Sequence, residues 1–308
     1  MSILPIVAVV GATASGKSDL ALDLAERLGA EVVNTDAMQV YRGMDIGTAK
    51  LPVSQRRGIP HHLLDLLDVT EPATVAEFQR WARAVIVDCR GRGVVPVLVG
   101  GSALYTRAIL DEFDFPGTDP EVRARYDALL AEVGPEALHA QLAEVDPVAA
   151  AGIIATNARR IVRALEVIEI TGRPFTASLP AATYADPATV QIGVDIDRPT
   201  LDARIADRVE RMWEHGFVDE VRALADRGLR DGLTANRALG YRQVLAYLDG
   251  EISEAEAKEQ TITGTRRFAR RQDSWFRKDE RISWVDHDDP ERVERALAVI
   301  GQAADVSE

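Results

Sequence analysis

The sequence is short of several residue types, and each shortage excludes a class of protein. Its 308 residues include a single cysteine, Cys89, which excludes an internal disulfide and a zinc module built from cysteines. No stretch approaches the roughly 18 consecutive apolar residues of a membrane-spanning helix, so we expect no membrane contact. No basic segment precedes the first apolar run, so we predict no signal peptide and a cytoplasmic protein.

Positive charge is also scarce. The formal net charge is −13, with 36 basic and 49 acidic residues, which argues against a general binder of polyanions. Any contact with nucleic acid must therefore come from a local basic patch on an acidic body. The remaining composition, 46% hydrophobic and 28% charged, is that of a globular protein with one large α/β domain or two smaller ones.

Residues 4–18 are the most informative stretch that is present. A short apolar run, Ile6–Val10, leads into a glycine-rich loop, and a helical pattern follows at 19–28. The loop matches the phosphate-binding pattern Gly-x4-Gly-Lys-Ser and consists of Gly11, Ala12, Thr13, Ala14, Ser15, Gly16, Lys17 and Ser18. Its N–H groups would converge on an anion at the helix N-terminus, where the dipole favours negative charge. Lys17 would add a positive charge for a nucleotide or diphosphate, and Ser18 a hydroxyl ligand for Mg²⁺.

Apolar runs and helical periods alternate along most of the chain. Strands are expected at 6–10, 31–34, 61–67, 93–99, 190–196 and 281–285, and helices at 19–28, 74–90, 103–110, 201–225 and 253–278. This alternation favours a parallel sheet covered on both faces. The predicted fold class is therefore α/β, a P-loop NTPase-like parallel sheet flanked by helices. After Gly301 the chain is polar, and we expect it to fray.

The pattern changes around Asp114. Residues 121–171 carry helical periods without a strand, between the turn-forming segment 115–120 and a second turn that ends at Pro174. We therefore predict an all-helical insertion domain at 120–187, within an α/β core formed by residues 1–119 and 188–308.

Two polar residues follow predicted strands and are candidates for chemistry. Asp36 follows the strand at 31–34, and Ser102 follows the strand at 93–99. The carboxyl ends of parallel strands meet at one edge of the sheet, beside the phosphate loop, and ligands bind there. Each residue also has a structural alternative, since Asp often caps a turn and Ser often caps a helix.

The phosphate loop alone does not define the reaction. Enzymes that transfer a terminal phosphoryl group need a second acidic residue for Mg²⁺ at a strand end. The strand at 93–99 ends in Gly100, Gly101 and Ser102 instead, and Asp88 follows an apolar run within helical surroundings. This weakens the NTPase interpretation. His61 and His62 lack a further ligand at metal-binding spacing, so we interpret them as packing or polar residues.

Two basic clusters oppose the acidic trend of the chain. Arg159, Arg160 and Arg163 lie on the predicted insertion, and Arg159 and Arg163 share a helix face. Residues 266–278 hold six basic residues against Asp273, with aromatic residues between them. Basic and aromatic side chains together suit phosphate contacts and base stacking. The structural alternative is a solvated basic helix face.

Together these motifs resemble the bacterial tRNA dimethylallyltransferases, also called isopentenyl-tRNA transferases. The similarity runs through nearly the whole chain, and the segment Tyr41–Lys50 is very specific to that family. The matching segments are 11–18, Asp36 with 40–50, 61–65, 99–105, 119–123, 160–166, 239–243 and 270–277.

The resemblance implies transfer of a dimethylallyl group from dimethylallyl diphosphate to N6 of the adenosine 3′-adjacent to the anticodon in tRNA. The P-loop would then hold a leaving diphosphate, with Mg²⁺, which accounts for the missing second acid. By the family pattern, Asp36 is the general base, Ser102 positions the amine and the diphosphate, and Lys17 stabilises the leaving group. The implied partners are dimethylallyl diphosphate and the anticodon stem-loop of tRNA, for a monomeric enzyme.

The resemblance also implies tRNA contacts from separate parts of the chain. These are Asp36, Ala37, Met38, Gln39 and Ser102; Arg123, Arg159, Arg160 and Arg163; and Arg237, Gly240, Tyr241, Arg242, Arg270, Arg271, Gln272, Trp275 and Arg277. Three positions depart from the family pattern, which usually has Pro at Ala12, Thr at Ser102 and Gln at Arg159.

Other functions are compatible with a phosphate loop. One is a prenyltransferase acting on free AMP, although a mononucleotide acceptor requires neither a helical insertion nor basic clusters. A second is a small-molecule kinase. A third is a non-enzymatic, nucleotide-gated RNA-binding switch.

Overall fold

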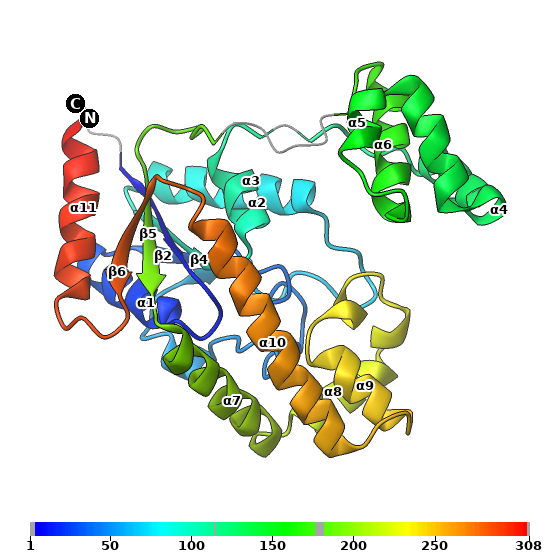
Figure 1. Cartoon of the computed structure of the whole chain (residues 1–308). Coiled ribbons are helices and arrows are strands. Elements are labelled where there is room, and N and C mark those ends of the chain that lie inside the picture. The colour runs from blue at the N-terminus through cyan, green and yellow to red at the C-terminus, as the bar shows by residue number, and fades with distance from the viewer. Residues whose placement is uncertain (1–3, 114, 176–181, 307–308) are drawn as a thin grey trace. The chain divides into compact units, whose positions relative to one another are not determined.

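A computed structural model describes residues 4–113, 115–175 and 182–306. Its centre is a six-stranded sheet in the order β3-β2-β4-β1-β5-β6, in which every neighbouring pair is parallel (Figure 1). The strands are β1 (Ile6–Val10), β2 (Glu31–Asn34), β3 (His61–His62), β4 (Pro96–Gly100), β5 (Thr189–Asp195) and β6 (Ile282–Asp286). The predicted α/β class is confirmed. Because all strands run the same way, the loops that follow them leave from one edge of the sheet.

Helices cover both faces of this sheet, and the sequence of β1 shows why. Ile6, Ala8 and Val10 point into one apolar cluster, whereas Val7 and Val9 point into another, so the whole strand is apolar. The second cluster is closed by α1 (Lys17–Leu28) and α11 (Arg292–Val306). The first is closed by α2 (Val75–Gly91) and α3 (Ala103–Leu110), together with the end of α10.

The C-terminal half of the core adds four more helices. These are α7 (Arg198–Glu214), α8 (Phe217–Asp226), α9 (Tyr241–Leu248) and α10 (Glu254–Phe276), with short 3₁₀ turns at Leu229–Asp231 and Ala235–Arg237. A further 3₁₀ turn, Val53–Gln55, lies between β2 and β3. The long helix α10 packs against α7 and α9 (Figure 1). It begins with a capping box, in which the Ser253 hydroxyl accepts from the N–H of Glu256 and the Glu256 carboxylate accepts from the N–H of Ser253.

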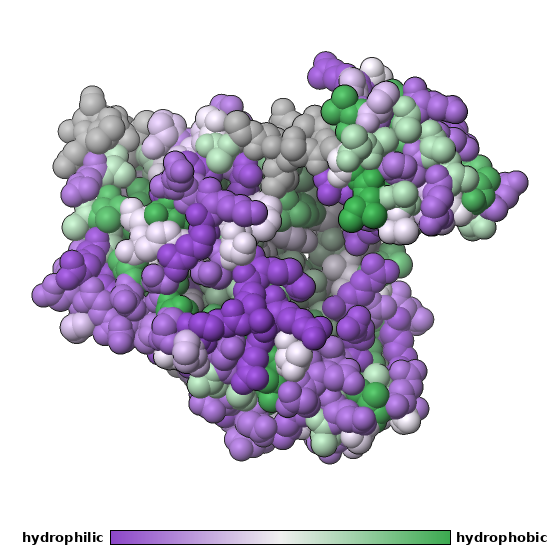
Figure 2. Space-filling model, viewed as in Figure 1, coloured by the Kyte–Doolittle hydropathy of each residue, from purple (hydrophilic) through white to green (hydrophobic). Residues whose placement is uncertain are grey.

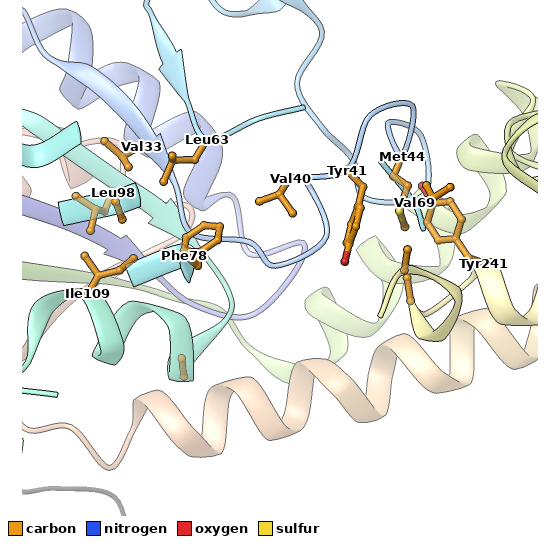
Figure 3. Packing of buried hydrophobic residues seen from close by; sticks show 14 of the residues in the cluster. Val33, Val40, Tyr41, Met44, Leu63, Val69, Phe78, Leu98, Ile109 and Tyr241 are labelled. Carbon is orange, nitrogen blue, oxygen red and sulfur yellow. The ribbon is translucent and has the colours of Figure 1, made fainter. Parts of the chain in front are cut away.

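The segment between β2 and β3 has little regular structure, yet it belongs to the core. Val40, Tyr41 and Met44 are fully buried. Figure 3 shows these side chains in a row that begins near Leu98 of the sheet and ends at Tyr241 of α9. Apolar packing along this row fixes a segment that turns alone would leave loose.

Residues Glu112–Thr183 form a compact unit of their own. It contains α4 (Pro120–Val145), α5 (Pro147–Ala151) and α6 (Ala158–Thr171) around a separate apolar cluster. The unit begins before, and ends before, the expected limits of 120 and 187. The two segments that connect the unit to the rest of the chain meet at these limits, since the N–H of Glu112 donates to the Thr183 carbonyl at 2.9 Å. In α4 the helical path is interrupted at Gly134, where φ is 81°.

Several expected boundaries were wrong. The single helix expected at 201–225 is two helices, because Gly216 adopts a φ of 88° that ends α7 and begins α8. The strand expected at 61–67 is limited to the edge pair of β3. The segment after Gly301 was expected to fray, but α11 continues to Val306; residues 307–308 lie outside the described residues. Within the described residues, no helix is long and apolar enough to cross a membrane.

Candidate active site

The P-loop connects the central strand β1 to α1. Gly16 sits at the N-cap of α1 with a φ of 98°, a left-handed conformation that glycine adopts readily. The Lys17 ammonium folds back over the loop and donates to the Ala12 carbonyl at 3.1 Å. Burial, together with repulsion from Arg208, lowers the pKa of Lys17 to about 8, although attraction to Asp36 opposes both effects. Folding therefore places the Lys17 ammonium where its charged form is disfavoured. Ionisable groups with pKa values shifted in this way are typical of functional sites.

A cavity of about 420 Å³ opens over this loop. The predicted loop residues Thr13, Ala14, Gly16, Lys17 and Ser18 line it, as do Asp36 and Gln39. Arginines line it as well: Arg204, Arg208, Arg211 and Arg292. Five cationic groups against the two carboxylates of Asp19 and Asp36 suit an anion that carries several charges.

The α7 arginines were missed by the sequence analysis. Arg208 donates to the Thr13 hydroxyl at 3.0 Å, and Arg204 donates to the Ser15 carbonyl at 3.4 Å. The signal was present in the spacing, since Arg204, Arg208 and Arg211 lie four and three residues apart and so share one helix face. Nothing in the sequence indicated that this face would meet the P-loop.

Asp36 lies at the carboxyl end of β2, as predicted. Asn34 stabilises its turn, because the Asn34 side chain accepts from the N–H of Asp36 at 2.8 Å and donates to its carbonyl at 3.1 Å. One carboxylate oxygen, Oδ1, accepts from the N–H of Met38 at 2.8 Å, so Asp36 does cap its turn. In the described part of the chain, no residue donates a hydrogen bond to Oδ2. Asp36 therefore caps its turn through one oxygen and leaves the other for a ligand, so its catalytic role stays a prediction.

A second cavity, of about 450 Å³, shares Thr13, Asp36, Thr48 and Arg208 with the first. Its wall is largely apolar and includes Val209, Met212, Phe217, Leu239 and Phe268. The predicted residues Ala37, Met38, Ser102, Arg237, Gly240, Tyr241, Arg242 and Arg271 also line it. Ser102 occupies the N-cap position of α3, but its hydroxyl makes no capping hydrogen bond. That observation weakens the capping explanation for Ser102.

Glu220 of α8 is a further residue that sequence reasoning missed. Its carboxylate accepts from the backbone N–H groups of Asp45, Ile46 and Gly47, at 3.0, 2.6 and 3.2 Å. It also accepts from the Tyr241 hydroxyl at 2.6 Å, and burial beside this anion raises the pKa of Tyr241 well above its usual value. One carboxylate thus fixes both the 45–47 segment and a wall of the second cavity.

Comparison with known proteins agrees with this geometry. Residues 39–279 match the family model described as IPP transferase. The chain belongs to the IPP transferase family. A tRNA dimethylallyltransferase from Nocardioides sp. is 69% identical over 301 residues, which cover 98% of this chain and 97% of the relative. One from Thermobifida fusca is 62% identical over 306 residues, covering 98% and 96%.

Solved structures lead to the same family. The full-length tRNA isopentenylpyrophosphate transferase from Bacillus halodurans superposes with a TM-score of 0.73 at 38% identity, covering 98% of this chain and 97% of that one. A eukaryotic dimethylallyltransferase acting on tRNA gives a TM-score of 0.85 at 26% identity, covering 96% and 78%. The resemblance inferred from the sequence motifs is confirmed.

Some of the α10 residues that the family pattern assigns to tRNA contact other parts of this protein instead. Gln272 is buried, and Trp275 packs partly buried against the core. Arg277 pairs with Asp195 and Asp273 and lies over the Trp284 ring at 4.0 Å. Arg270 and Arg271 are exposed, and strongly hydrophilic side chains gather over α10 in Figure 2. Arg270 and Arg271 are therefore the α10 residues best able to meet tRNA, and their contact stays a prediction.

The arginines of the insertion are also divided. Arg123 and Arg163 both donate to the buried Glu166 carboxylate, at 3.0 and 2.9 Å. Arg163 additionally donates to the carbonyls of Gly117 and Pro116. Both therefore stabilise the insertion, whereas Arg159 and Arg160 are exposed on α6. Their tRNA contacts stay predictions.

The fold supplies His62 with neighbours that the sequence did not indicate. His62 Nε2 lies 2.7 Å from Glu31, and the Cys89 thiol donates to Glu31 at 3.5 Å. Metal binding is nevertheless disfavoured, because the Arg92 guanidinium donates hydrogen bonds to both oxygens of the Glu31 carboxylate and brings a positive charge beside them. Burial raises the pKa of Cys89 to about 11, so it stays a thiol. The polar role expected for His62 fits this arrangement.

Proposed function

We propose that this protein transfers a dimethylallyl group from dimethylallyl diphosphate to N6 of the adenosine 3′-adjacent to the anticodon in tRNA, releasing diphosphate. Family membership supports the reaction class. The observation that carries the proposal is that Asp36 lines two adjoining cavities of different character. One is cationic and suits a diphosphate, and the other is largely apolar and suits an isoprenoid chain or a base.

The first cavity would hold the diphosphate. The P-loop N–H groups and the charges of Lys17, Arg204 and Arg208 converge there. The donor set also fits Mg²⁺, which prefers a few protein oxygens together with phosphate oxygens and water, and Ser18 lines the same cavity. Bound Mg²⁺ would supply charge neutralisation for the leaving diphosphate. Lys17 and the arginines would stabilise the same charge from the protein side.

The transfer forms an N6–C1 bond, breaks the C1–O bond and moves one proton from N6 to a base. The adenine N6 lone pair attacks C1 of the dimethylallyl group, and the C1–O bond breaks with its electron pair leaving on diphosphate. The N6 amine is a poor nucleophile because its lone pair is delocalised into the ring, so removal of its proton assists the attack. Asp36 accepts that proton on Oδ2, the oxygen that does not bind Met38. The Ser102 hydroxyl, on the wall of the second cavity, orients the amine.

The second cavity would receive the target adenine from tRNA. A base inside the anticodon stem-loop must leave its stack before it can reach a carboxylate in a cavity. Tyr241 and Phe268 offer aromatic surface there, and Arg237, Arg242 and Arg271 offer charge for the flanking phosphates. We further propose that the helical insertion contacts the same tRNA, and that the protein acts as a monomer in the cytoplasm.

The decisive experiment follows the label from dimethylallyl diphosphate. The full chain is incubated with radiolabelled dimethylallyl diphosphate, Mg²⁺ and an anticodon stem-loop RNA with adenosine 3′-adjacent to the anticodon. We expect label in the RNA, N6-dimethylallyl adenosine in its nuclease digest, and one diphosphate released per transfer. A matched RNA with guanosine at that position is the control and should stay unlabelled.

Two outcomes would replace the proposal with an alternative. Label transferred to free AMP but not to RNA would make the protein a prenyltransferase acting on a mononucleotide. Hydrolysis of ATP, or phosphorylation of a small molecule, without any transfer of label would favour a kinase.

A further inference from the structure

Gln272 is the one α10 residue named by the family pattern whose side chain bridges two loops of the proposed active site. Its Oε1 accepts a hydrogen bond from the backbone N–H of Thr13 at 2.9 Å. Its Nε2 donates to the backbone carbonyl of Gly101 at 2.8 Å. The residue is 6% exposed, so its side-chain amide is largely shielded from solvent. The amide thus links the P-loop to the loop that follows β4.

The position of Gln272 on α10 explains why it reaches inward. It shares the buried face of the helix with Ala269 and Phe276, which lie three residues before it and four residues after it. Arg270 and Arg271 are exposed. The same stretch of sequence therefore presents charge outward and a polar amide inward.

The partner loop is shaped around this amide. A Cβ atom at Gly101 would lie 2.3 Å from the Gln272 Nε2, closer than real side chains approach. Glycine at 101 lets the carbonyl come within hydrogen-bonding distance of the buried helix face. The Gln272 amide satisfies both partners at once, because Thr13 offers a donor and Gly101 offers an acceptor.

Both loops carry residues of the proposed reaction. Thr13 lines both cavities, and its hydroxyl accepts from Arg208. Ser102, on the wall of the second cavity, follows Gly101 directly in the chain. A link between Thr13 and Gly101 therefore sets the separation between the phosphate-binding loop and the Ser102 hydroxyl.

We propose that Gln272 is a positioning residue, and not a tRNA contact: it holds the P-loop and the Ser102 loop in register so that diphosphate and amine meet at the correct distance. This inference rests on the proposed function. It differs from the expectation from the family pattern, which groups Gln272 with the tRNA-binding residues.

The test uses two variants of similar size to glutamine. One removes both hydrogen bonds of the amide, and the other removes only the bond to Gly101. Gln272→Met has a similar length and no charge, and it removes both hydrogen bonds. Gln272→Glu keeps the acceptor for Thr13 and places a carboxylate oxygen against the Gly101 carbonyl. Gln260→Met is the matched control, because Gln260 is an exposed glutamine on the same helix. Thermal unfolding shows whether each variant folds. If Gln272→Met does not fold, Gln272→Glu is measured in its place.

A positioning role predicts a lower turnover number with an unchanged affinity for tRNA. Small displacements of reacting groups can cost about 10²-fold in rate, so we expect kcat of Gln272→Met to fall by about that factor. The Kd for the anticodon stem-loop RNA should not change, and Gln260→Met should match the wild type in both. A higher Kd for RNA with unchanged kcat would make Gln272 a tRNA contact and overturn the proposal. Unchanged kcat and Kd would overturn it too.

The binding of inorganic diphosphate separates this proposal from the proposed function. Because Gln272 fixes the Thr13 N–H, its loss should weaken diphosphate binding even in the absence of any prenyl transfer. Wild-type protein without transferase activity would refute the proposed function, and Gln272 would then be judged on diphosphate binding alone. Equal diphosphate affinities of wild type and Gln272→Met in that case would refute the positioning role.

Discussion

Two groups of arginines in this protein differ in their density along the sequence and in the partners that the structure gives them. Arg204, Arg208 and Arg211 are spread along α7 and line the cavity over the P-loop. Arg163 and Arg277 belong to dense basic clusters, yet they bind acidic side chains of their own fold. Charge density along the chain is therefore a poor guide to the charge that a ligand meets. What decides is whether a nearby carboxylate has already neutralised the guanidinium.

The largest expected effect lies at the carboxylate that faces the cavity arginines. Asp36→Asn keeps the size of the side chain and removes the base, so kcat should fall by about 10² to 10⁴. The RNA Kd should stay the same, because the proposed RNA-binding charges are elsewhere. Single-turnover rates and RNA binding measure the two quantities separately. A lower RNA affinity with unchanged kcat would mean that Asp36 binds substrate and is not the base.

The same substitution in the two arginine groups should affect different properties. Arg208→Gln removes a charge aimed at the diphosphate, and such groups contribute about 10² to 10³ in rate. Arg163→Gln removes one of two partners of the buried Glu166, which should destabilise the insertion by about 1.5–3 kcal/mol and leave kcat intact. Steady-state kinetics and denaturant unfolding of both variants test this. The comparison fails if Arg163→Gln loses rate and Arg208→Gln loses only stability.

A third prediction concerns Arg270 and Arg271, two exposed arginines of α10 that the family pattern assigns to tRNA. Each phosphate contact contributes about one unit to the slope of log affinity against log salt. Arg270→Gln with Arg271→Gln should therefore flatten the slope for RNA by about one to two units and raise KM for RNA. KM for dimethylallyl diphosphate should not change. Arg277→Gln is the comparison variant, since its guanidinium is already paired. Parallel salt dependences for wild type and double variant would show that these arginines contact no phosphate.

The Ser102 hydroxyl should have a smaller effect. Because it makes no capping bond, Ser102→Ala should lose less than the roughly 1 kcal/mol of stability that a capping residue contributes. Turnover should fall about tenfold or more if the hydroxyl orients the amine, and Ser102→Thr should restore it. A drop in the midpoint of unfolding with normal turnover would instead indicate a helix cap.

The pH dependence of diphosphate binding is the most subtle prediction. Lys17 has a pKa of about 8 in the folded protein against 10.5 for the free side chain, so its charge is lost as pH rises through about 8. Affinity for inorganic diphosphate should fall over that range, and Lys17→Met should lack this contribution. A pKa lowered by folding also means that the charged lysine destabilises the native state below about pH 8, and that this penalty is relieved between pH 8 and 10.5. Lys17→Met should therefore unfold at a higher temperature at pH 7.

The parts of the site that were predictable from the sequence are local. β1, the P-loop and α1 follow each other within a few turns of chain, so the apolar run, the glycines and the helical period determine them together. Asp36 and Ser102 could be assigned to the sheet edge for the same reason, since each directly follows its own strand. The helical character of the insertion was also predictable, because its helices are amphipathic and pack mainly on one another.

Only the tertiary structure decided which side chains, distant in the sequence, contact these local elements of the site. Arg208 reaches Thr13 across 195 residues, Gln272 reaches it across 259, and Glu220 binds a segment about 174 residues earlier. No period or spacing encodes such contacts, because they depend on how helices pack against the sheet and on which acids lie nearby. The sequence by itself determined the glycine-rich loop at the end of β1 and so the prediction of a phosphate site there. The packing of α7, α8 and α10 determined which charges and amides surround it.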